Sequence, residues 1–296
     1  MVASDWLNKY FIICSNILGS CYGTTGPVSI NPSSGTKYGP DFPAITLRDA
    51  VTLQRYLLEE EFHVHQVQTV IGGSLGGMQA LEWAFQSQET NYIKSFVTIA
   101  CNAQHSAWQI AMSELQRQAI YMDPKFCNGH YYTSSALPDT GLALARQIAM
   151  ISYRTHAAYA EKFGRREEEY AADKNTRLSK HGRYVVQSYL NYQGDKFLSR
   201  FDANSYLTLL HMMDTHDVGR GRGGVNKALS SLSQPALVIG FDSDILYPLC
   251  EQQQLADGLP NAQFATLSSV HGHDGVLLAQ EEISELTKRF LAEYVE

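Results

Sequence analysis

A serine flanked by small residues is the feature of this sequence best suited to chemistry. Ser74 stands in Gly72-Gly73-Ser74-Leu75-Gly76, which matches the G-x-S-x-G pattern. In that pattern a strand turns sharply into a helix and leaves the serine exposed at the tip with strained backbone angles. Small residues let the strand and the helix approach closely, where a Cβ would clash. We therefore predict that Ser74 is a nucleophile.

The flanks of the motif favour a nucleophile over a glycine-rich turn that holds a phosphate. The spacing fits neither G-x-G-x-x-G nor a P-loop, and no Gly-Lys-Ser/Thr follows it. A β-like apolar run, Val67–Ile71, precedes the glycines, and good helix formers, Met78–Glu82, follow them. This order of strand, turn and helix is the context that the motif requires.

A serine nucleophile needs a base to take its proton and an acid to hold that base in the right tautomer. Where G-x-S-x-G marks a nucleophile, the acid follows it along the chain and the histidine comes last. The residues alone leave two choices for each partner: Asp242 or Asp244 for the acid, and His271 or His273 for the base. The Leu/Tyr-Pro sequence that follows favours Asp244, and the preceding glycine favours His273.

A metal site is the competing interpretation of the histidine segment, His271-Gly272-His273-Asp274. Metal sites built on histidine usually show a spaced ligand set such as H-E-x-x-H, and the sequence contains none. We therefore expect no metal ion in this protein.

The elements that would position these residues indicate an α/β protein with a mostly parallel sheet. Continuous apolar runs, typical of strands covered on both faces, predict strands at 10–14, 67–71, 95–100, 235–240 and 262–267. Helical periodicity predicts helices at 46–60, 76–86 and 279–295. The candidate nucleophile, acid and base then follow three different strands.

About 135 residues separate the strands at 95–100 and 235–240, more than one crossover helix needs. Helix-like stretches fill the gap at 106–121, 139–160, 183–192 and 204–214. We predict a helical lid insertion at 103–228, on a core made of 1–102 and 229–296. Within the lid, we expect the charged stretch 164–180 to be solvated and Gly219–Gly224 to be a flexible basic loop.

Composition limits the class of protein and its partners. The chain has 296 residues, of which 44% are apolar and 18% charged, as in ordinary soluble globular proteins. Its net charge of −7 argues against nucleic acid or an anionic membrane as a partner. Five cysteines, without a C-x-x-C pair, favour the reducing cytoplasm. The apolar run at 10–14 is too short to span a membrane and lacks the features of a signal peptide.

Several longer stretches make the sequence resemble the homoserine O-acetyltransferase family, acyltransferases with the α/β-hydrolase fold. The resemblance covers essentially the whole chain. The matching stretches are YFIICSNILGSCYGTTGPVSINPSSGTKYG (10–39) with PDFP (40–43), the elbow GGSLGGMQALEWA, HSAWQIAMSELQRQAIYMDP (105–124), FDANSYLTLL (201–210), FDSDILYP (241–248) and HGHDGVLL (271–278).

The resemblance implies a catalytic triad in which Ser74 is the nucleophile, Asp244 the acid and His273 the base. It also implies that the N–H of Leu75, directly after the nucleophile, is an oxyanion-hole donor.

The resemblance further assigns three substrate-binding residues. Asp274 matches the residue that holds the amino group of the substrate. Arg146 and Tyr153 match lid residues that hold its carboxylate and line the site. A guanidinium suits that role because it binds a carboxylate bidentately.

The reaction that the resemblance implies is a ping-pong acetyl transfer from acetyl-CoA, through acetyl-Ser74, to the hydroxyl of L-homoserine. The product would feed methionine synthesis, and acetyl-CoA would be a co-substrate, with no metal or redox cofactor. Family members are often homodimers through the lid helices. The alternatives are a succinyl donor, serine as the acceptor, a serine esterase or hydrolase with the same triad, or an inactive remnant.

The sequence departs from the family at its start, since family members begin well upstream of Met1. The first strands, with a loop that normally supplies the second oxyanion donor, are therefore expected to be missing. Loss of one such donor costs about 10²–10³ in rate. The missing strand would lie between the predicted strand at 10–14 and the elbow strand, and its loss would leave backbone groups unpaired. We accordingly expect a poorly folded or weakly active chain.

Overall fold

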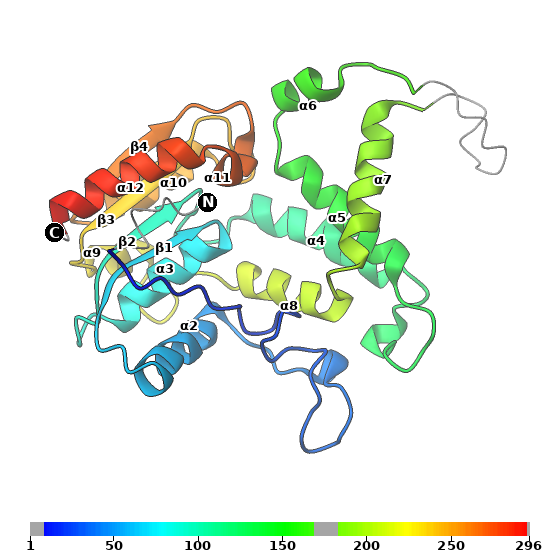
Figure 1. Ribbon diagram of the computed structural model, residues 1–296, viewed down its shortest axis with the longest axis horizontal. Helices are drawn as coiled ribbons and strands as arrows, with labels where there is room; N and C mark the ends of the chain where they lie inside the picture. Colours follow the sequence, from blue (N-terminus) through cyan, green and yellow to red (C-terminus); the bar gives the residue numbers. More distant parts are fainter. Residues whose placement is uncertain (1–8, 169–182, 295–296) are drawn as a thin grey trace.

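The computed structural model describes residues 9–168 and 183–294 (Figure 1). Its sheet has the strand order β1-β2-β3-β4, and every neighbouring pair is parallel. The four strands are β1 (Val67–Gly73), β2 (Ile93–Ile99), β3 (Ala236–Phe241) and β4 (Ala262–Leu267). The α/β class predicted from the sequence is confirmed. The carboxyl ends of parallel strands lie at the same edge, so the segments after β1, β3 and β4 meet there.

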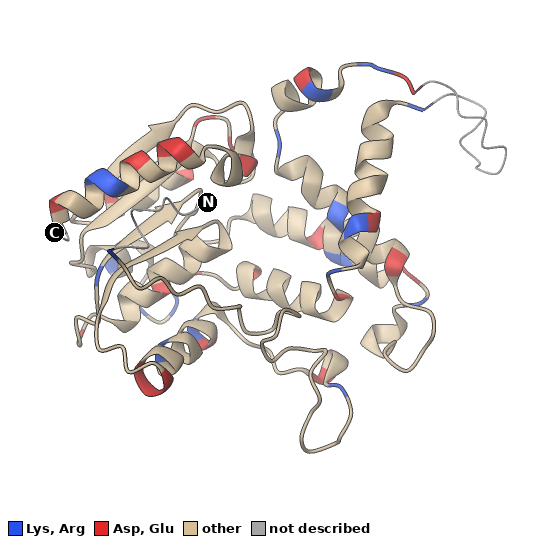
Figure 2. Cartoon of the chain, viewed as in Figure 1, with Lys and Arg blue, Asp and Glu red and all other residues tan. Residues whose placement is uncertain are grey.

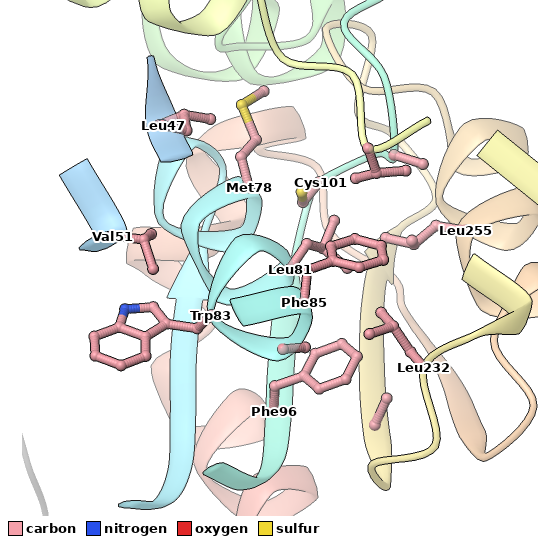
Figure 3. Close-up of a cluster of buried hydrophobic side chains, with 14 of the residues drawn as sticks. Leu47, Val51, Met78, Leu81, Trp83, Phe85, Phe96, Cys101, Leu232 and Leu255 are labelled. Carbon is pink, nitrogen blue, oxygen red and sulfur yellow. The ribbon is translucent and has the colours of Figure 1, made fainter. Parts of the chain in front are cut away.

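Helices cover both faces of the sheet because the central strands are apolar on both sides. Phe96 and Val238 face a cluster built with α2 (Leu47–Tyr56), α3 (Leu75–Gln86) and α10 (Leu249–Gly258). Figure 3 shows this cluster, with Leu81 and Phe85 of α3 beside Phe96. Neighbouring strand residues point to the opposite face. Accordingly, Val97 and Ile239 pack with α12 (Gln280–Tyr294), next to Phe290.

The stretch between β2 and β3 is helical, as predicted, and its helices other than α9 (Val225–Ser230), which lies beside the sheet, form their own group in Figure 1. It has a separate apolar cluster that includes Ile120, Leu142 and Phe197. Its helices are α4 (Ala107–Tyr121), α5 (Asp139–Ser152), α6 (His156–Phe163), α7 (Val185–Leu198), α8 (Ala203–Asp214) and α9 (Val225–Ser230). The lid boundaries at 103 and 228, and with them the core segments 1–102 and 229–296, stay a prediction.

The single helix predicted at 139–160 is wrong, because the chain leaves the helix after Ser152 and re-enters it at His156. Thr155 caps the new helix: its side chain accepts a hydrogen bond from the Ala158 N–H. Such a cap satisfies a backbone donor that has no partner within the helix. The break divides the predicted helix into α5 and α6 and places Tyr153 at its corner.

The strand predicted at 10–14 is also wrong. The described part of this segment has no strand, and Phe11 is 78% exposed. Among the residues that the structure describes, β1 is an edge strand that pairs only with β2. The strand expected between β1 and 10–14 is therefore not found there, and 10–14 has no neighbouring strand to share its backbone hydrogen bonds. An apolar run becomes a strand only when its N–H and C=O groups find such a neighbour.

The loop Gly219–Gly224, predicted to be flexible, is anchored to the core. Arg222 makes two hydrogen bonds to the carboxylate of Glu82, at 3.0 and 2.6 Å, and its guanidinium lies 4.0 Å from the Phe85 ring centroid. Glu82 is buried on α3, and Arg48 approaches it at 3.5 Å. A buried carboxylate needs such partners, and this one ties the loop down. The charged stretch 164–180 lies mostly outside the described residues.

Replacing Arg222 with methionine should lower the free energy of unfolding by about 2 kcal/mol, because it leaves the buried Glu82 carboxylate with Arg48 alone. Urea denaturation measures this change. Arg220→Met is the matched control, since Arg220 is an exposed arginine of the same loop. Equal stability of the two variants would contradict the prediction.

Over 9–168 and 183–294, no helix has the length and apolar character needed to cross a membrane. Lys and Arg positions are interspersed with Asp and Glu positions along the described chain (Figure 2).

Candidate active site

Ser74 occupies a strained turn between β1 and α3. Its backbone angles are φ 54° and ψ −120°, a region that residues with a side chain rarely adopt. The turn is fixed by the Ser74 N–H, which donates to the Ile99 carbonyl at 2.8 Å. The Ser74 carbonyl accepts hydrogen bonds from Gly77 and Met78. The structure thus contains the elbow that the G-x-S-x-G pattern predicts.

Close packing explains two glycines of the elbow, but not a third. A Cβ on Gly72 would lie 2.0 Å from the Gly76 carbonyl oxygen, and one on Gly77 would lie 2.7 Å from Cys101 Cβ. A Cβ on Gly76 would meet nothing within 4 Å. The expectation that every glycine of the motif avoids a clash is therefore wrong for Gly76.

Three candidate side chains form one hydrogen-bonded row. The Nε2 atom of His273 lies 2.8 Å from Ser74 Oγ, and its Nδ1 atom lies 2.8 Å from Asp244 Oδ2. Asp242 instead accepts a hydrogen bond from the Ser269 N–H at 3.2 Å. With a neutral imidazole, Nδ1–H donates to the carboxylate and Nε2 accepts from the serine hydroxyl. The geometry therefore selects Asp244 and His273 from the pairs that the residues left open.

Both oxygens of Asp244 have defined tasks. Oδ1 accepts the backbone N–H groups of Leu246 and Tyr247, at 2.8 and 2.9 Å, while Oδ2 faces His273. Asp244 is only 4% exposed. The loop after β3 thus fixes the orientation of the carboxylate.

The predicted carboxylate-binding residues lie next to this row. The Tyr153 ring is 5.9 Å from the His273 ring, and Arg146 Cζ is 5.6 Å from the Tyr153 ring centroid. Arg146 Nε is buried without a hydrogen-bond partner, and no carboxylate of the described residues pairs with this guanidinium. Burial raises the pKa of Tyr153, and the positive charge of Arg146 opposes that rise. The site thus holds a cation that is free to bind an anionic group.

Asp274, predicted to hold an amino group, already has one cationic partner. Arg154 Nε donates to Asp274 Oδ2 at 2.7 Å, and the Asp274 N–H donates to the Tyr153 carbonyl at 3.0 Å. The Thr155 hydroxyl donates to the Val270 carbonyl. These contacts join the corner between α5 and α6 to the histidine loop. Sequence analysis missed Arg154, since nothing local distinguishes it from a surface arginine.

Leu75 is the first residue of α3. The N–H groups in the first turn of a helix have no partner inside the helix, so the Leu75 N–H is available next to the nucleophile. Its role in an oxyanion hole stays a prediction.

Comparison with known proteins identifies the family. Residues 2–274 match a family model described as alpha/beta hydrolase fold. Two relatives named homoserine O-acetyltransferase come from Trichormus variabilis and Chloroherpeton thalassium. They are 49% and 48% identical, over 96% and 95% of this chain and 75% and 71% of their own lengths. The chain belongs to the homoserine O-acetyltransferase family.

Solved structures of proteins with two different activities share the fold of this member of the homoserine O-acetyltransferase family. The homoserine O-acetyltransferase from Bacillus anthracis matches with a TM-score of 0.82 at 24% identity, covering 92% of this chain and 72% of that one. Esterase E22 matches with a TM-score of 0.79 at 28% identity, covering 90% and 72%. A choice between transfer and hydrolysis must therefore be argued from the side chains around the row Ser74–His273–Asp244, since the fold alone does not make it.

Sequence analysis of this family member also missed Tyr247. Its buried ring stacks on His273 with 5.0 Å between the ring centroids and 25° between the planes. Its place three residues after Asp244, in FDSDILYP, is the signal in the sequence that points to it. A buried aromatic so close to a candidate acid is a candidate for contact with the base.

A buried cluster of amide and carboxylate groups supports the acid loop from behind. Gln109 Nε2 donates to the Leu246 carbonyl and to Glu251 Oε2, each at 2.8 Å. Asn102 Nδ2 donates to the same Glu251 oxygen at 2.8 Å. These bonds connect the start of the lid, in α4, to the segment that carries Asp244.

Proposed function

We propose that this chain transfers an acetyl group from acetyl-CoA to the side-chain hydroxyl of L-homoserine. The observation that carries the proposal is the hydrogen-bonded row Ser74–His273–Asp244 beside Arg146, whose guanidinium pairs with no carboxylate of the described residues. The 48–49% identity to relatives named homoserine O-acetyltransferase supports the same activity. The product, O-acetyl-L-homoserine, would enter methionine synthesis.

In the first half-reaction, His273 Nε2 accepts the Ser74 proton while Oγ attacks the thioester carbonyl carbon of acetyl-CoA. The Leu75 N–H donates to the oxyanion that develops. The carbon–sulfur bond then breaks, the CoA thiolate takes the proton from His273, and acetyl-Ser74 remains.

In the second half-reaction, the homoserine hydroxyl gives its proton to His273 and attacks the acetyl carbon. The bond to Ser74 Oγ breaks, and the serine regains the proton from His273. These steps use acetyl-CoA as co-substrate and assign no task to a metal or redox cofactor.

The acceptor is an amino acid in this proposal because charges of both signs surround the row. Arg146 would bind its carboxylate beside the Tyr153 ring. Asp274 would bind its ammonium group through Oδ1, which accepts no hydrogen bond from the described residues, while Arg154 holds Oδ2. An acceptor held at both ends presents its hydroxyl to the acetyl group ahead of water.

Replacing Arg146 with methionine should lower kcat/KM for homoserine by about 10- to 100-fold, because the charged hydrogen bonds to the carboxylate are lost. The rate of acylation by acetyl-CoA should not change. Stopped-flow measurement of the two half-reactions separates these effects. The matched control is Arg200→Met, since Arg200 also lies over the Phe197 ring but is exposed. An unchanged KM for homoserine in Arg146→Met would contradict the proposed role.

An assay of CoA release tests the function, with acetyl-CoA alone and with homoserine, and with Ser74→Ala as the blank. Release that requires homoserine supports the transferase. Equal release without an acceptor supports the hydrolase, which the likeness to esterase E22 makes the second candidate. No release under either condition contradicts both. Parallel reactions with succinyl-CoA and with L-serine decide the donor and the acceptor.

We also infer that the chain forms a homodimer through the lid. Trp108 and Leu115 on α4 and Met122 at its C-cap are exposed at seven-residue spacing, and Leu144 and Ile151 repeat that spacing on α5. Residues seven apart lie on one face of a helix, and such apolar seams pack against other helices. A second copy of the chain presents the same apolar residues of α4 and α5, so a symmetric contact between the two copies would bury them.

Leu115→Glu should convert the dimer to a monomer, because it places a charge in the proposed seam. Light scattering coupled to size-exclusion chromatography gives the molar mass. Tyr56→Glu on α2 is the control, since Tyr56 is 58% exposed and Leu115 is 56% exposed. An unchanged mass for Leu115→Glu would exclude this interface.

We place the enzyme in the cytoplasm, where its acetyl-CoA would be available. All five cysteines are free thiols, which fits a reducing compartment.

A further inference from the structure

The loop after β3 holds Tyr247 rigidly. Its N–H donates to Asp244 Oδ1 at 2.9 Å, and its carbonyl accepts from Gln252 Nε2 at 2.7 Å. The residue is 1% exposed. Tyr247 is therefore part of the same fixed unit as the acid of the triad.

The ring of Tyr247 restricts the imidazole of the base. It stacks on His273 with 5.0 Å between the centroids, and the ring of Tyr153 approaches the same imidazole at 5.9 Å. One of these rings comes from the sheet edge and the other from the lid. The contacts limit rotation of the ring that must accept a proton from Ser74 and return it.

The hydroxyl of Tyr247 lies next to a second histidine. It is 3.5 Å from His105 Nδ1. Burial raises the pKa of Tyr247 well above its ordinary value, and hydrogen bonding with the Ser74 side chain acts in the opposite direction. The phenol therefore stays protonated at neutral pH, and its O–H has an acceptor in His105 Nδ1.

A buried chain of polar groups fixes His105 behind the tyrosine. His105 Nε2 lies 3.7 Å from Asp214 Oδ1, and Asp214 forms an ion pair with Arg117. Neither Nε2 nor Oδ1 has a hydrogen-bond partner elsewhere in the described chain, so they face one another. Burial lowers the pKa of His105 to about 4, so the ring is neutral at pH 7. The tautomer with Nε2–H toward Asp214 leaves Nδ1 as an acceptor for Tyr247.

We propose that Tyr247 positions the imidazole of the base for transfer of the Ser74 proton. The ring of Tyr247 stacks on His273, and its O–H donates to His105 Nδ1, so the phenol cannot turn away from the imidazole. The inference rests on the proposed function only in assigning Ser74 as the nucleophile.

Tyr247→Phe tests the hydroxyl, because it keeps the stacked ring. Acylation and kcat should each fall about 10-fold, with KM unchanged for both substrates, because loss of the bond to His105 lets the ring move away from the imidazole, which transfers the proton and does not hold either substrate. Tyr92→Phe is the control: Tyr92 is another buried tyrosine, and its hydroxyl donates to the Val64 carbonyl far from the site. Full kcat in Tyr247→Phe would overturn the inference, as would a loss confined to KM.

A second pair of variants, at His105, keeps the test valid if Tyr247→Phe folds poorly. His105→Gln retains an oxygen acceptor for the tyrosine hydroxyl, and His105→Leu does not. We expect His105→Leu to lower acylation several-fold and His105→Gln to restore most of it. Equal acylation rates in the two variants would contradict the role of His105 as the acceptor that holds the Tyr247 hydroxyl.

An activated ester, p-nitrophenyl acetate, separates failure of this inference from failure of the proposed function. It acylates a nucleophilic serine without needing CoA or homoserine. If the wild type shows a burst with the ester but no reaction with acetyl-CoA, the proposed function fails and the burst rate still tests Tyr247. If the wild type reacts with both and Tyr247→Phe matches it in both, the inference alone fails.

Discussion

Replacing Asp244 with asparagine should lower kcat for acyl transfer by about 10⁴-fold. Asp244 Oδ1 accepts two backbone N–H groups, so in the variant the amide oxygen must take that place and the NH₂ must face His273. His273 Nδ1 then accepts a hydrogen bond, and the ring proton moves to Nε2. An Nε2–H group cannot take the proton of Ser74.

Steady-state kinetics on folded Asp244→Asn measures this loss, and circular dichroism checks the fold. Asp242→Asn is the matched control, two residues away in the same loop. Among the described residues, the Asp242 carboxylate accepts a hydrogen bond only from the Ser269 N–H, so its variant should keep wild-type activity. If Asp244→Asn stays within about tenfold of the wild type, the row found in the structure is not the catalytic machinery.

The row itself was accessible from the sequence because each member is marked locally. The elbow has its glycines, and the other two side chains follow apolar runs that form neighbouring strands. Parallel topology then brings all three to one edge of the sheet. The residues alone did not separate Asp242 from Asp244 or His271 from His273. Which of two loop residues two positions apart points its side chain into the site depends on the backbone conformation of the loop, and hydrophobic periodicity does not reveal that conformation.

The side chains that surround the row were not accessible in this way. Arg154 meets Asp274 across 120 positions, and Tyr247 meets His105 across 142. Contacts at such separations depend on how the lid lies against the sheet edge, and they leave no periodic signal. The break at Tyr153 has the same origin, because contacts to the histidine loop and the cap at Thr155 override a continuous helical pattern.

The failed strand at 10–14 shows the limit of local propensity most clearly. The run is apolar and β-like, yet a strand exists only through its neighbours. Similarly, Arg222 reads as a loop cation, whereas its partner, Glu82, belongs to a helix 140 positions earlier. Charge and apolar patterns in the sequence indicate which side chains and backbone groups need a partner. Whether a partner is present depends on the tertiary structure.

Acid should unfold this protein through two buried histidines, His105 and His216, where the lid joins the sheet. The backbone N–H of His105 donates to the His216 carbonyl, and His216 Nε2 hydrogen-bonds the Asn102 carbonyl at 3.1 Å. Burial lowers the pKa of each from 6.5 to about 4. Above pH 6.5 both histidines are neutral in the folded and the unfolded chain, and they contribute no pH dependence.

Below pH 6.5 the two histidines become protonated in the unfolded chain, whereas in the folded chain they stay neutral until about pH 4. The free energy of unfolding therefore falls as the pH drops through this window. The loss reaches about 3 kcal/mol for each histidine at pH 4. Burial also raises the pKa of Asp214, which acts in the opposite direction as the pH falls. Urea denaturation from pH 7 to pH 4 measures the net slope. Comparison with His105→Gln/His216→Gln isolates the histidines, because the carboxyl groups are common to both proteins.

The double variant should lose about 6 kcal/mol of the difference in stability between pH 7 and pH 4, even if it is less stable than the wild type at pH 7. His211→Gln, at an exposed position of α8, should keep the full slope. A slope that survives in the double variant would mean that both histidines take up protons in the folded protein as readily as in the unfolded chain. Below pH 6.5, His105 Nδ1 would then be a donor, and the Tyr247 hydroxyl would have lost its acceptor.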